Sequence, residues 1–407
     1  MKILMVNKFL YPNGGSETYI FKLGEELVKR GHQVEYFGME HEGRIAGNRM
    51  ESYTSDMDFH TGKIKKLLYP FKIIYSVEAR KKLRKVLQDF EPDVVHLNNF
   101  NFQLTPSIIY EVRSFDKKKG KKTALIYTAH DYQWVCPNHM FRIPGTGELC
   151  MRCAGGAYGN CAKYKCIHNS RIRSILGTIE GSLYGRLKTY RQVDRIICPS
   201  HFMETALSRN PLLGDKMVTM HNFIEKTPDG KDCIKQDYVL YFGRYTEEKG
   251  VRTLMEVCRD LSDIPFVFAG SGPLKEEIGQ IPNIEDRGFL TGDRLEQTIR
   301  GARFVVFPSE WYENCPFSVM EAQMYGTPVL ASDIGGTPEL IQKGRTGELF
   351  SVGDVGQLGE RIRRLWTEKE KCSAYAANCR ELVFDTVSEY AEKIVQIYGR
   401  AGIEGQK

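Results

Sequence analysis

Short apolar runs alternate with longer amphipathic segments along most of the chain, and this alternation limits the folds open to it. In the first half the runs are ILMVN, QVEYFG, VVHLN, ALIYTAH and RIICPS, each followed by helix-like sequence. A second series begins at YVLYFGR and continues through FVFAG, FVVFPS and PVLAS. Strands that alternate with helices are typical of parallel sheets covered by helices. The pattern therefore predicts an α/β protein with two doubly wound parallel sheets.

The length of 407 residues agrees with two domains, because a domain usually holds about 100 to 200 residues. A polar stretch, KTPDGKDCIKQD, follows Phe223 and Ile224, and its Pro, Gly and charges suit a linker. We expect one domain over residues 1–222, a second over 223–385, and a C-terminal helix with a polar tail over 386–407. Ligands of parallel sheets bind at the carboxyl ends of the strands, so a cleft between the two domains is the expected site.

The composition is that of a soluble globular protein, with 42% hydrophobic, 27% charged and 11% aromatic residues. No stretch approaches the roughly 18 apolar residues that a membrane helix needs. The N-terminal MKILMVNKF is interpreted as a buried strand rather than a secretory signal, because its apolar run is short and no small-residue cleavage site follows. These features predict a cytoplasmic protein with reduced cysteines.

The net charge is +6, and basic residues cluster in the N-terminal half. Such runs are usually solvated helix faces and loop tips, but the first is interleaved with apolar residues and also suits an anionic membrane surface, here the inner face of the cell membrane. No nucleic-acid-binding motif accompanies the charge, so no nucleic-acid partner is expected. The first stretch holds Lys63, Lys65, Lys66, Lys72, Arg80, Lys81, Lys82, Arg84 and Lys85, and the second holds Arg113, Lys117, Lys118, Lys119, Lys121 and Lys122.

Two strand-loop-helix junctions carry features of phosphate binding. The first is the loop around Gly15 in NGGSE, where paired glycines let backbone amides approach an anion at a helix N-terminus. The second, GRYTEEKG, places the guanidinium of Arg244 and the ammonium of Lys249 at the end of the first strand of the second series. Two cations at this position can neutralise a diphosphate leaving group. A glycine turn and a solvated charged loop are the ordinary alternatives.

A third constellation runs from Pro308 to Pro328 and contains two glutamates, Glu313 and Glu321, separated by seven residues. A carboxylate such as Glu321 near a helix start can accept both hydroxyls of a ribose. The backbone amides around Phe317 and Ser318 are predicted to face phosphate. A pair of surface glutamates is the alternative that the flanking GTPVLAS and GGTPE motifs argue against.

The order of these motifs, GGSE, TAHDY, GRYTEEKG, AGSGP, the two glutamates, GTPVLAS and GGTPE, resembles glycosyltransferase family 4 over nearly the whole chain. The resemblance implies the GT-B fold, with two Rossmann-like domains and a C-terminal helix that packs on the N-terminal one. It implies that Gly15, Arg244 and Lys249 bind a donor diphosphate, that Glu321 holds the ribose and that Glu313 contacts the donor sugar. It also places His130 beside the transferred sugar, and Gly288 and Phe289 in the loop that receives the base.

The resemblance further implies a retaining transfer from a nucleotide-sugar, most simply a UDP- or GDP-sugar, to a glycan or lipid-linked acceptor. Attack would come from the face that the diphosphate leaves, so no carboxylate nucleophile is needed. Catalysis would rest on orientation and on stabilising the departing phosphate, which involves His130, Arg244, Lys249 and Glu313. No catalytic divalent metal is expected, since the Asp-x-Asp triplet Asp56-Met57-Asp58 lies away from the donor motifs and is interpreted as a loop.

A cysteine-rich insertion over about residues 136–168 distinguishes this chain within the family, as a subgroup with extra residues after TAHDY. The spacing of Cys150 and Cys153 is that of a zinc knuckle, and a loop-rich insertion needs such a constraint. We expect a structural zinc, and an insertion that shapes acceptor recognition. An iron–sulfur cluster, free thiols and a redox disulfide are alternatives. The preferred ligands are Cys136, Cys150, Cys153 and Cys166, with Cys161 able to replace either outer one.

Two other function classes fit parts of the sequence. A phosphorylase or a nucleotide-sugar epimerase could use the same motifs, and a product assay separates them from a transferase. A non-catalytic nucleic-acid-binding protein could combine the basic stretches with a zinc knuckle. The intact set of Arg244, Lys249, Glu313 and Glu321 argues against this second class.

Overall fold

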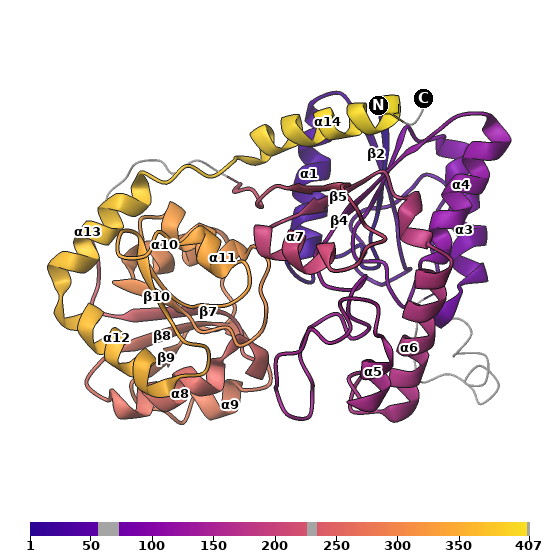
Figure 1. The fold of residues 1–407 in the computed structure, drawn as a ribbon. Helices are drawn as coiled ribbons and strands as arrows, with labels where there is room; N and C mark the ends of the chain where they lie inside the picture. Colours follow the sequence, from indigo (N-terminus) through magenta and orange to yellow (C-terminus); the bar gives the residue numbers. More distant parts are fainter. Residues whose placement is uncertain (56–72, 226–233, 405–407) are drawn as a thin grey trace. The chain divides into compact units, whose positions relative to one another are not determined.

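The computed structural model describes residues 1–55, 73–225 and 234–404. Its contacts divide the chain into a first unit, Met1–His221 with Val387–Lys407, and a second unit, Asn222–Thr386 (Figure 1). Within the described residues each unit holds one six-stranded sheet, and all strand pairs are parallel. The α/β class predicted from the sequence is therefore confirmed. Lys63, Lys65, Lys66 and Lys72 of the first basic stretch, and Asp56 and Asp58, lie outside the described residues.

The sheet of the first unit has the strand order β2-β1-β3-β4-β5-β6. Its central strands are buried on both faces, as parallel sheets covered by helices require, and Ile3 to Val6 of β1 are all fully buried. The register pairs Ile3 with Val94 and Val95 with Leu125. The strands are β1 (Lys2–Val6), β2 (Gln33–Phe37), β3 (Val94–Leu97), β4 (Ala124–Thr128), β5 (Arg195–Cys198) and β6 (Met217–Thr219).

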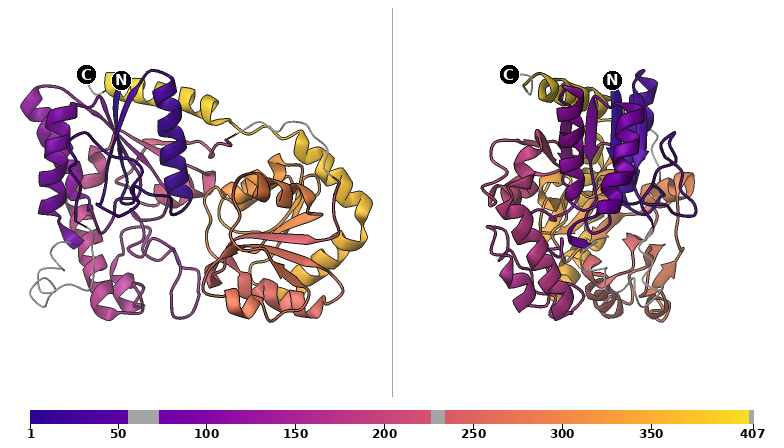
Figure 2. Two further views of the ribbon diagram at one scale, coloured as in Figure 1. Left: turned by 180° about the vertical axis from the view of Figure 1, so that it is seen from behind. Right: turned by 90° about the vertical axis from the view of Figure 1, so that its right-hand side faces the viewer.

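Helices cover this sheet in two pairs: α1 packs against α14, and α3 packs against α4 (Figures 1 and 2). Serine side chains cap several of them, and the Ser76 hydroxyl accepts a hydrogen bond from the Ala79 N–H at the start of α3. No helix in the described ranges is both long and apolar enough to cross a membrane. The helices are α1 (Gly15–Lys29), α3 (Val77–Phe90), α4 (Ser107–Lys119), α5 (Gly159–Lys163), α6 (Arg171–Arg186), α7 (His201–Ser208) and α14 (Val387–Glu404), with a 3₁₀ turn, η1 (Thr189–Gln192).

The sheet of the second unit has the order β12-β11-β10-β7-β8-β9. Its strands are β7 (Val239–Arg244), β8 (Phe266–Ser271), β9 (Ile284–Asp286), β10 (Phe304–Phe307), β11 (Val329–Ser332) and β12 (Gly347–Phe350). Its helices are α8 (Val251–Asp260), α9 (Lys275–Ile278), α10 (Gly292–Gly301), α11 (Phe317–Met324), α12 (Val355–Thr367) and α13 (Lys369–Arg380), with the 3₁₀ turns η2 (Glu247–Lys249) and η3 (Thr337–Leu340).

Side chains of β7 alternate between two hydrophobic cores, one on each face of the second sheet. Val239 and Tyr241 join the core formed with α8, α9, α12 and α13. Leu240 and Phe242 join the core formed with α10 and α11. In Figure 1, α8 and α9 lie below the sheet whereas α10 and α11 lie above it. The cores fix the strands, and so fix where their carboxyl ends emerge.

A buried polar network joins α14 to the rest of the first unit. The Tyr398 hydroxyl lies 2.7 Å from His96 Nδ1, and His96 Nε2 lies 2.7 Å from Thr128 Oγ1. The Tyr19 hydroxyl contacts both Thr128 Oγ1, at 3.2 Å, and the Tyr390 hydroxyl, at 3.0 Å. All five side chains are buried, and paired polar groups in a core favour a single arrangement because an unpaired one is costly. The network therefore specifies how α14 docks.

His96 makes this docking sensitive to acid. Burial lowers the pKa of His96 to about 3, below its ordinary value of 6.5, so the unfolded chain takes up a proton first as the pH falls. We expect the free energy of unfolding to decrease from pH 6.5 toward pH 3, by up to about 1.4 kcal/mol per pH unit for this one group. The measurement is chemical denaturation across this pH range, with hydrogen exchange assigning the loss to the first unit. A His96→Asn variant should show a shallower slope, and an unchanged slope would contradict the assignment to His96.

Candidate functional site

The residues predicted to bind the donor in the second unit follow the carboxyl ends of its strands. Arg244 ends β7, Gly288 and Phe289 follow β9, and Glu313 and Glu321 follow β10. In a parallel sheet all carboxyl ends lie at one edge, where loops and helix N-termini gather. The sheet therefore collects on one edge side chains that are far apart in the sequence.

The β7–α8 loop packs tightly against the β10–α11 loop. Gly250 has a φ of +68°, and a Cβ there would stand 1.8 Å from the Pro308 carbonyl oxygen, so only glycine fits. The Glu310 N–H donates to the Glu248 carbonyl oxygen at 2.9 Å across the same boundary. Gly250 thus lets the loop that carries Arg244 and Lys249 pack against the loop that carries Glu313.

Lys249 and Glu313 form an ion pair at this junction, with 2.5 Å between Nζ and Oε1. The two side chains are only 18% and 9% exposed, so solvent screens the pair weakly. The Ser309 hydroxyl donates to the same Glu313 oxygen at 2.9 Å, and Lys249 Nζ lies 5.1 Å from the Trp311 ring. Two predicted site residues, separated by 64 positions, are therefore in direct contact.

The Glu313 backbone is held by the GGTPE segment after β11. Gly335 has a φ of +62°, and a Cβ there would stand 2.3 Å from the Glu313 carbonyl oxygen. The Gly336 N–H donates to that oxygen at 2.7 Å. The paired glycines thus allow a close backbone approach that aims the Glu313 side chain at Lys249.

Arg244 differs from Lys249 because its side chain is 63% exposed and lies 4.0 Å from Glu248, an ion pair that solvent weakens. The Tyr241 hydroxyl donates to the Arg244 carbonyl oxygen at 2.7 Å, which fixes the backbone at the end of β7. An arginine with a fixed backbone and an exposed guanidinium can reach a phosphate in solution.

Helix α11 carries three predicted residues. Phe317 and Ser318 are its first two residues, where N–H groups have no acceptors within the helix and the helix dipole is positive. Glu321 lies one turn further along. Burial, and then the charge of Glu225, raise the pKa of Glu321 to about 7. This places an anion-attracting helix end and a half-buried carboxyl on one short helix.

Gly288 and Phe289 stand apart from this group, because β7 and β8 separate β9 from β10 in the sheet. Gly288 has a φ of +67°, and its N–H donates to Asp286 Oδ1 at 2.9 Å. Phe289 is 75% exposed. An exposed aromatic ring at the edge of the sheet is suited to stacking on a planar base, and the role predicted for these residues stays a prediction.

In the first unit, Gly15 is the first residue of α1 and is exposed. The carboxylate of Glu17 lies just inside the helix, where it accepts hydrogen bonds from Asn7 Nδ2 at 2.8 Å and from the Ser16 hydroxyl at 3.0 Å. Asn99 Nδ2 in turn donates to Ser16 Oγ at 2.9 Å. Side chains from the ends of β1 and β3 thus organise the loop that holds Gly15.

His130 follows β4, and its Nε2 lies 2.9 Å from Oδ1 of Asn98, which follows the neighbouring strand β3. Its ring meets Tyr19 edge to face, with 4.9 Å between ring centroids. Burial lowers the pKa of His130 to about 4, so the imidazole is neutral at neutral pH. The neutral ring can therefore donate from Nε2 to Asn98, which fixes its tautomer and orientation.

The sequence analysis did not single out Asn98 or Ser309, which contact His130 and Glu313 directly. Both are polar residues at or just beyond the carboxyl end of a buried strand, and this position is the signal that could have found them. The Asn98–His130 contact depends on which strands are neighbours, because this hydrogen bond needs the ends of β3 and β4 side by side. The Ser309–Glu313 contact forms within the single loop that follows β10.

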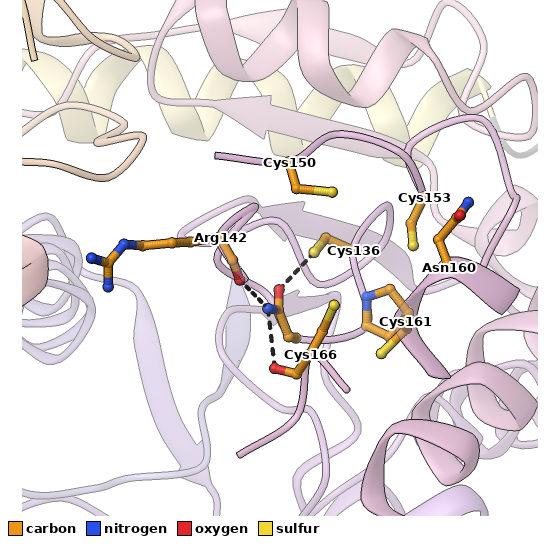
Figure 3. Close-up of a pocket in the computed structure, with 9 residues that line it drawn as sticks. Cys136, Arg142, Cys150, Cys153, Asn160, Cys161 and Cys166 are labelled. Carbon is orange, nitrogen blue, oxygen red and sulfur yellow. Dashed lines mark hydrogen bonds between the residues drawn. The ribbon is translucent and has the colours of Figure 1, made fainter. Parts of the chain in front are cut away.

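The five cysteines of the insertion line one cavity of about 10 Å³ (Figure 3). Burial raises the pKa of the Cys136 and Cys153 thiols to about 12. The ten cysteines of the described ranges are all free. In the same ranges, no three His, Cys, Asp or Glu side chains already form a metal-ligating group. The cavity is lined by Cys136, Cys150, Cys153, Cys161 and Cys166 together with Pro137, Asn138, Arg142 and Asn160.

Comparison with known proteins identifies the family. The sequence model described as Glycosyltransferase Family 4 matches residues 13–227, more than half of the chain, and the model described as Glycosyl transferases group 1 matches residues 236–368. The chain belongs to glycosyltransferase family 4. It is therefore a glycosyltransferase, as the order of its motifs predicted.

Relatives in this family transfer different sugars. The sulfoquinovosyl transferase SQD2 of Arabidopsis thaliana is 33% identical over 162 residues, 38% of this chain and 30% of that protein. The alpha-D-kanosaminyltransferase of Streptomyces kanamyceticus is 28% identical over 178 residues, 40% of this chain and 46% of that protein. The chain thus spans less than half the length of these two relatives. An uncharacterized 42.6 kDa protein in the cps region of Klebsiella pneumoniae is 25% identical over 84% of this chain and 87% of its own length.

Solved structures with the same architecture include the sucrose-phosphate synthase of Thermosynechococcus elongatus, with a TM-score of 0.69, 16% identity and 98% coverage of both chains. Anabaena Alr3699/HepE in complex with UDP has a TM-score of 0.67 and 16% identity, and covers 98% of this chain and all of its own. At this identity the likeness establishes the fold alone, and it confirms the predicted GT-B fold class.

The Lys249–Glu313 pair yields a stability prediction. In Lys249→Met, Glu313 keeps its buried charge but loses the cation, and we expect the second unit to lose on the order of 3 kcal/mol of unfolding free energy. The control Lys275→Met removes a lysine that is 59% exposed and only 3.9 Å from Asp286, and we expect a loss of about 0.5 kcal/mol or less. Chemical denaturation with hydrogen exchange resolves the two units. A Glu313→Gln change added to Lys249→Met should recover part of the loss, and equal losses for the two lysine variants would contradict this account.

Proposed function

We propose that this glycosyltransferase is a retaining enzyme that transfers a sugar from a nucleoside-diphosphate donor, UDP- or GDP-linked, to a glycan or lipid-linked acceptor. The observation that carries the proposal is the carboxyl edge of the second sheet. There the exposed guanidinium of Arg244, the paired Lys249 and Glu313, and the N-terminus of α11 occupy neighbouring loops. Such a set suits an anionic leaving group rather than a neutral ligand.

The chemistry assigned to these residues follows from their charges. As the bond from the sugar to the diphosphate breaks, negative charge grows on the departing oxygen, and Arg244 and Lys249 stabilise it. Lys249 is in contact with Glu313, and the carboxylate holds the ammonium in place. The same carboxylate lies where it can accept hydrogen bonds from hydroxyls of the donor sugar. Attack on the same face as departure gives retention without a protein nucleophile.

Glu321 supports the nucleotide part of the proposal. Its partly buried carboxyl, one turn into α11, can accept hydrogen bonds from the two hydroxyls of a ribose, while the amides of Phe317 and Ser318 donate to phosphate oxygens. The roles predicted for Gly15, His130, Gly288 and Phe289 belong to the same proposal. Alr3699/HepE is described in complex with UDP and with UDP-glucose, which favours UDP as the first nucleotide to test here. No catalytic divalent metal is part of the proposal.

The proposal for the acceptor rests on the relatives and on surface charge. Two relatives of high coverage are described as proteins of a cps region in Klebsiella pneumoniae, which favours a glycan product. The basic residues Lys117, Lys118 and Lys119 end α4 in the first unit, and an anionic membrane surface would suit them. We therefore keep a cytoplasmic enzyme at the inner face of the membrane, with the cysteine-rich insertion shaping acceptor recognition, as the working proposal.

Nucleotide binding is tested by thermal unfolding with UDP, GDP, ADP and inorganic phosphate. A ligand at about one hundred times its dissociation constant adds roughly 2.7 kcal/mol, which raises the midpoint of a unit of this size by several degrees. We expect one nucleoside diphosphate to raise the unfolding midpoint of the wild type by several degrees. Arg244→Ala should abolish most of the shift, whereas Arg259→Ala, an exposed arginine on α8, should retain it. The proposal is wrong if no diphosphate shifts the midpoint or if Arg244→Ala keeps the full shift.

Retention is tested by following the anomeric proton of the product with NMR from the first turnovers. With a donor whose sugar is α-linked to the diphosphate, we expect an α-linked product. A β-linked product would refute the front-face mechanism while leaving the transferase assignment intact. Sugar release that needs inorganic phosphate would instead indicate a phosphorylase, and donor conversion without acceptor would indicate an epimerase.

A further inference from the structure

The cysteine-rich insertion has little core of its own. Between Cys136 and Cys166 its only helix in the described residues is α5, Gly159–Lys163. Its hydrophobic cluster consists of Ile143, Tyr158 and three of the cysteines. A loop-rich segment with so few apolar side chains gains little from burial, so it needs another constraint to hold one conformation. The cysteines occupy the place where that constraint would act.

All five thiols of the insertion line a single small cavity (Figure 3). In the close-up, Cys150 and Cys153 are drawn in the upper part of the view, and Cys161 and Cys166 in the lower part. The cavity volume is about 10 Å³, about the space that one water-sized sphere needs. It therefore suits a single ion rather than a cluster of several iron and sulfur atoms.

Hydrogen bonds hold the two ends of the insertion at this cavity. Asn138 Nδ2 donates to the carbonyl oxygens of Arg142, at 2.6 Å, and of Cys166, at 3.3 Å. Asn138 Oδ1 accepts from the Cys136 thiol at 2.8 Å. The Asn138 amide thus bridges the first cysteine of the insertion and the last.

We propose that Cys136, Cys150, Cys153 and Cys166 bind one structural Zn²⁺ ion in this cavity. Zinc prefers tetrahedral thiolate sites, and the C-x-x-C spacing of Cys150 and Cys153 supplies two adjacent ligands. In the described residues no three of these side chains yet have ligating geometry, so binding requires rotation of thiols about χ1, a change between staggered positions. Cys136 would turn from Asn138 toward the cavity.

The choice of four ligands from five thiols follows from their places in the chain. Cys136 and Cys166 begin and end the insertion, so ligation by both closes its whole length, whereas Cys161 lies in α5, five residues before Cys166. Closing the longer loop removes more conformational entropy from the unfolded chain. Cys161 then remains a buried thiol that lines the cavity without ligating the ion.

The zinc site would also constrain the chain that leaves His130. Asp131 and His139 pair at 3.4 Å, and the Tyr132 N–H donates to the His139 carbonyl oxygen at 3.3 Å. Cys136 lies inside this closed segment. Ligation of Cys136 would therefore fix the segment that directly follows His130, and this is the structural role that the proposal assigns to the metal.

Metal content of the full-length protein, purified without a metal-binding tag, tests the proposal. Elemental analysis should find about one zinc and no iron per chain. Cys150→Ser, Cys153→Ser, Cys136→Ser and Cys166→Ser should each lose most of the zinc. Cys161→Ser should retain it, as should the control Cys372→Ser, since serine can replace the hydrogen bond from Cys372 to the Leu365 carbonyl oxygen.

If the ligand variants fail to fold, zinc binding is tested on the wild-type protein instead. Blocking its thiols with a mercurial reagent should release the zinc, measured with a chromogenic chelator, and Co²⁺ exchange should give the absorption of a tetrahedral thiolate site. A metal-free protein with five reactive thiols, a disulfide among them, or bound iron would each overturn the proposal. Zinc lost in Cys161→Ser but kept in Cys136→Ser would overturn the ligand assignment.

Discussion

Parallel strand pairing is the constraint on which the rest of this structure depends. Because every strand of a parallel sheet points the same way, all the loops that follow the strands gather at one edge. In the second unit this edge receives the loop after β7 and the loop after β10, which are neighbours in the sheet. Gly250 and Gly335 then allow backbones to approach so closely that no side chain would fit between them. The contact between Lys249 and Glu313 is the outcome, and it requires both the strand order and the two glycines.

The same constraint organises the first unit, with a different chemical result. Strands β3 and β4 are neighbours, so Asn98 and His130 emerge side by side and form a hydrogen bond. On the same two strands, His96 contacts both Thr128 and Tyr398 of α14. The C-terminal helix is therefore held by side chains that begin at the base of the loop carrying His130. Burial keeps both histidines neutral, which lets each act as donor and acceptor at once.

The sequence was sufficient to predict the fold class and the family, because both rest on local patterns repeated many times. Alternating apolar runs and helical segments identify parallel sheets, and motif order identifies the family. The residue pairs that complete the candidate site could not be predicted in this way. Glu313 lies 64 positions from Lys249, His130 lies 32 from Asn98, and Tyr398 lies 302 from His96. Such contacts depend on strand order and on exact loop geometry, which local periodicity does not contain. The cysteine cluster is intermediate: its spacing indicated a shared site, but only the folded insertion brings all five thiols to one cavity.

The two glutamates that the sequence presented as a matched pair occupy opposite environments. Glu313 is held by Lys249 and Ser309, so its charge is compensated. Glu321 is half-buried near another carboxylate, Glu225, and its pKa is raised to about 7. A carboxylate whose charge is uncompensated gains most from new hydrogen-bond donors, because they replace the water that burial removed. The hydroxyls of a ribose would supply such donors. The difference in environment is thus a physical reason for assigning recognition of the nucleotide to Glu321, and contact with the sugar beside the leaving group to Glu313.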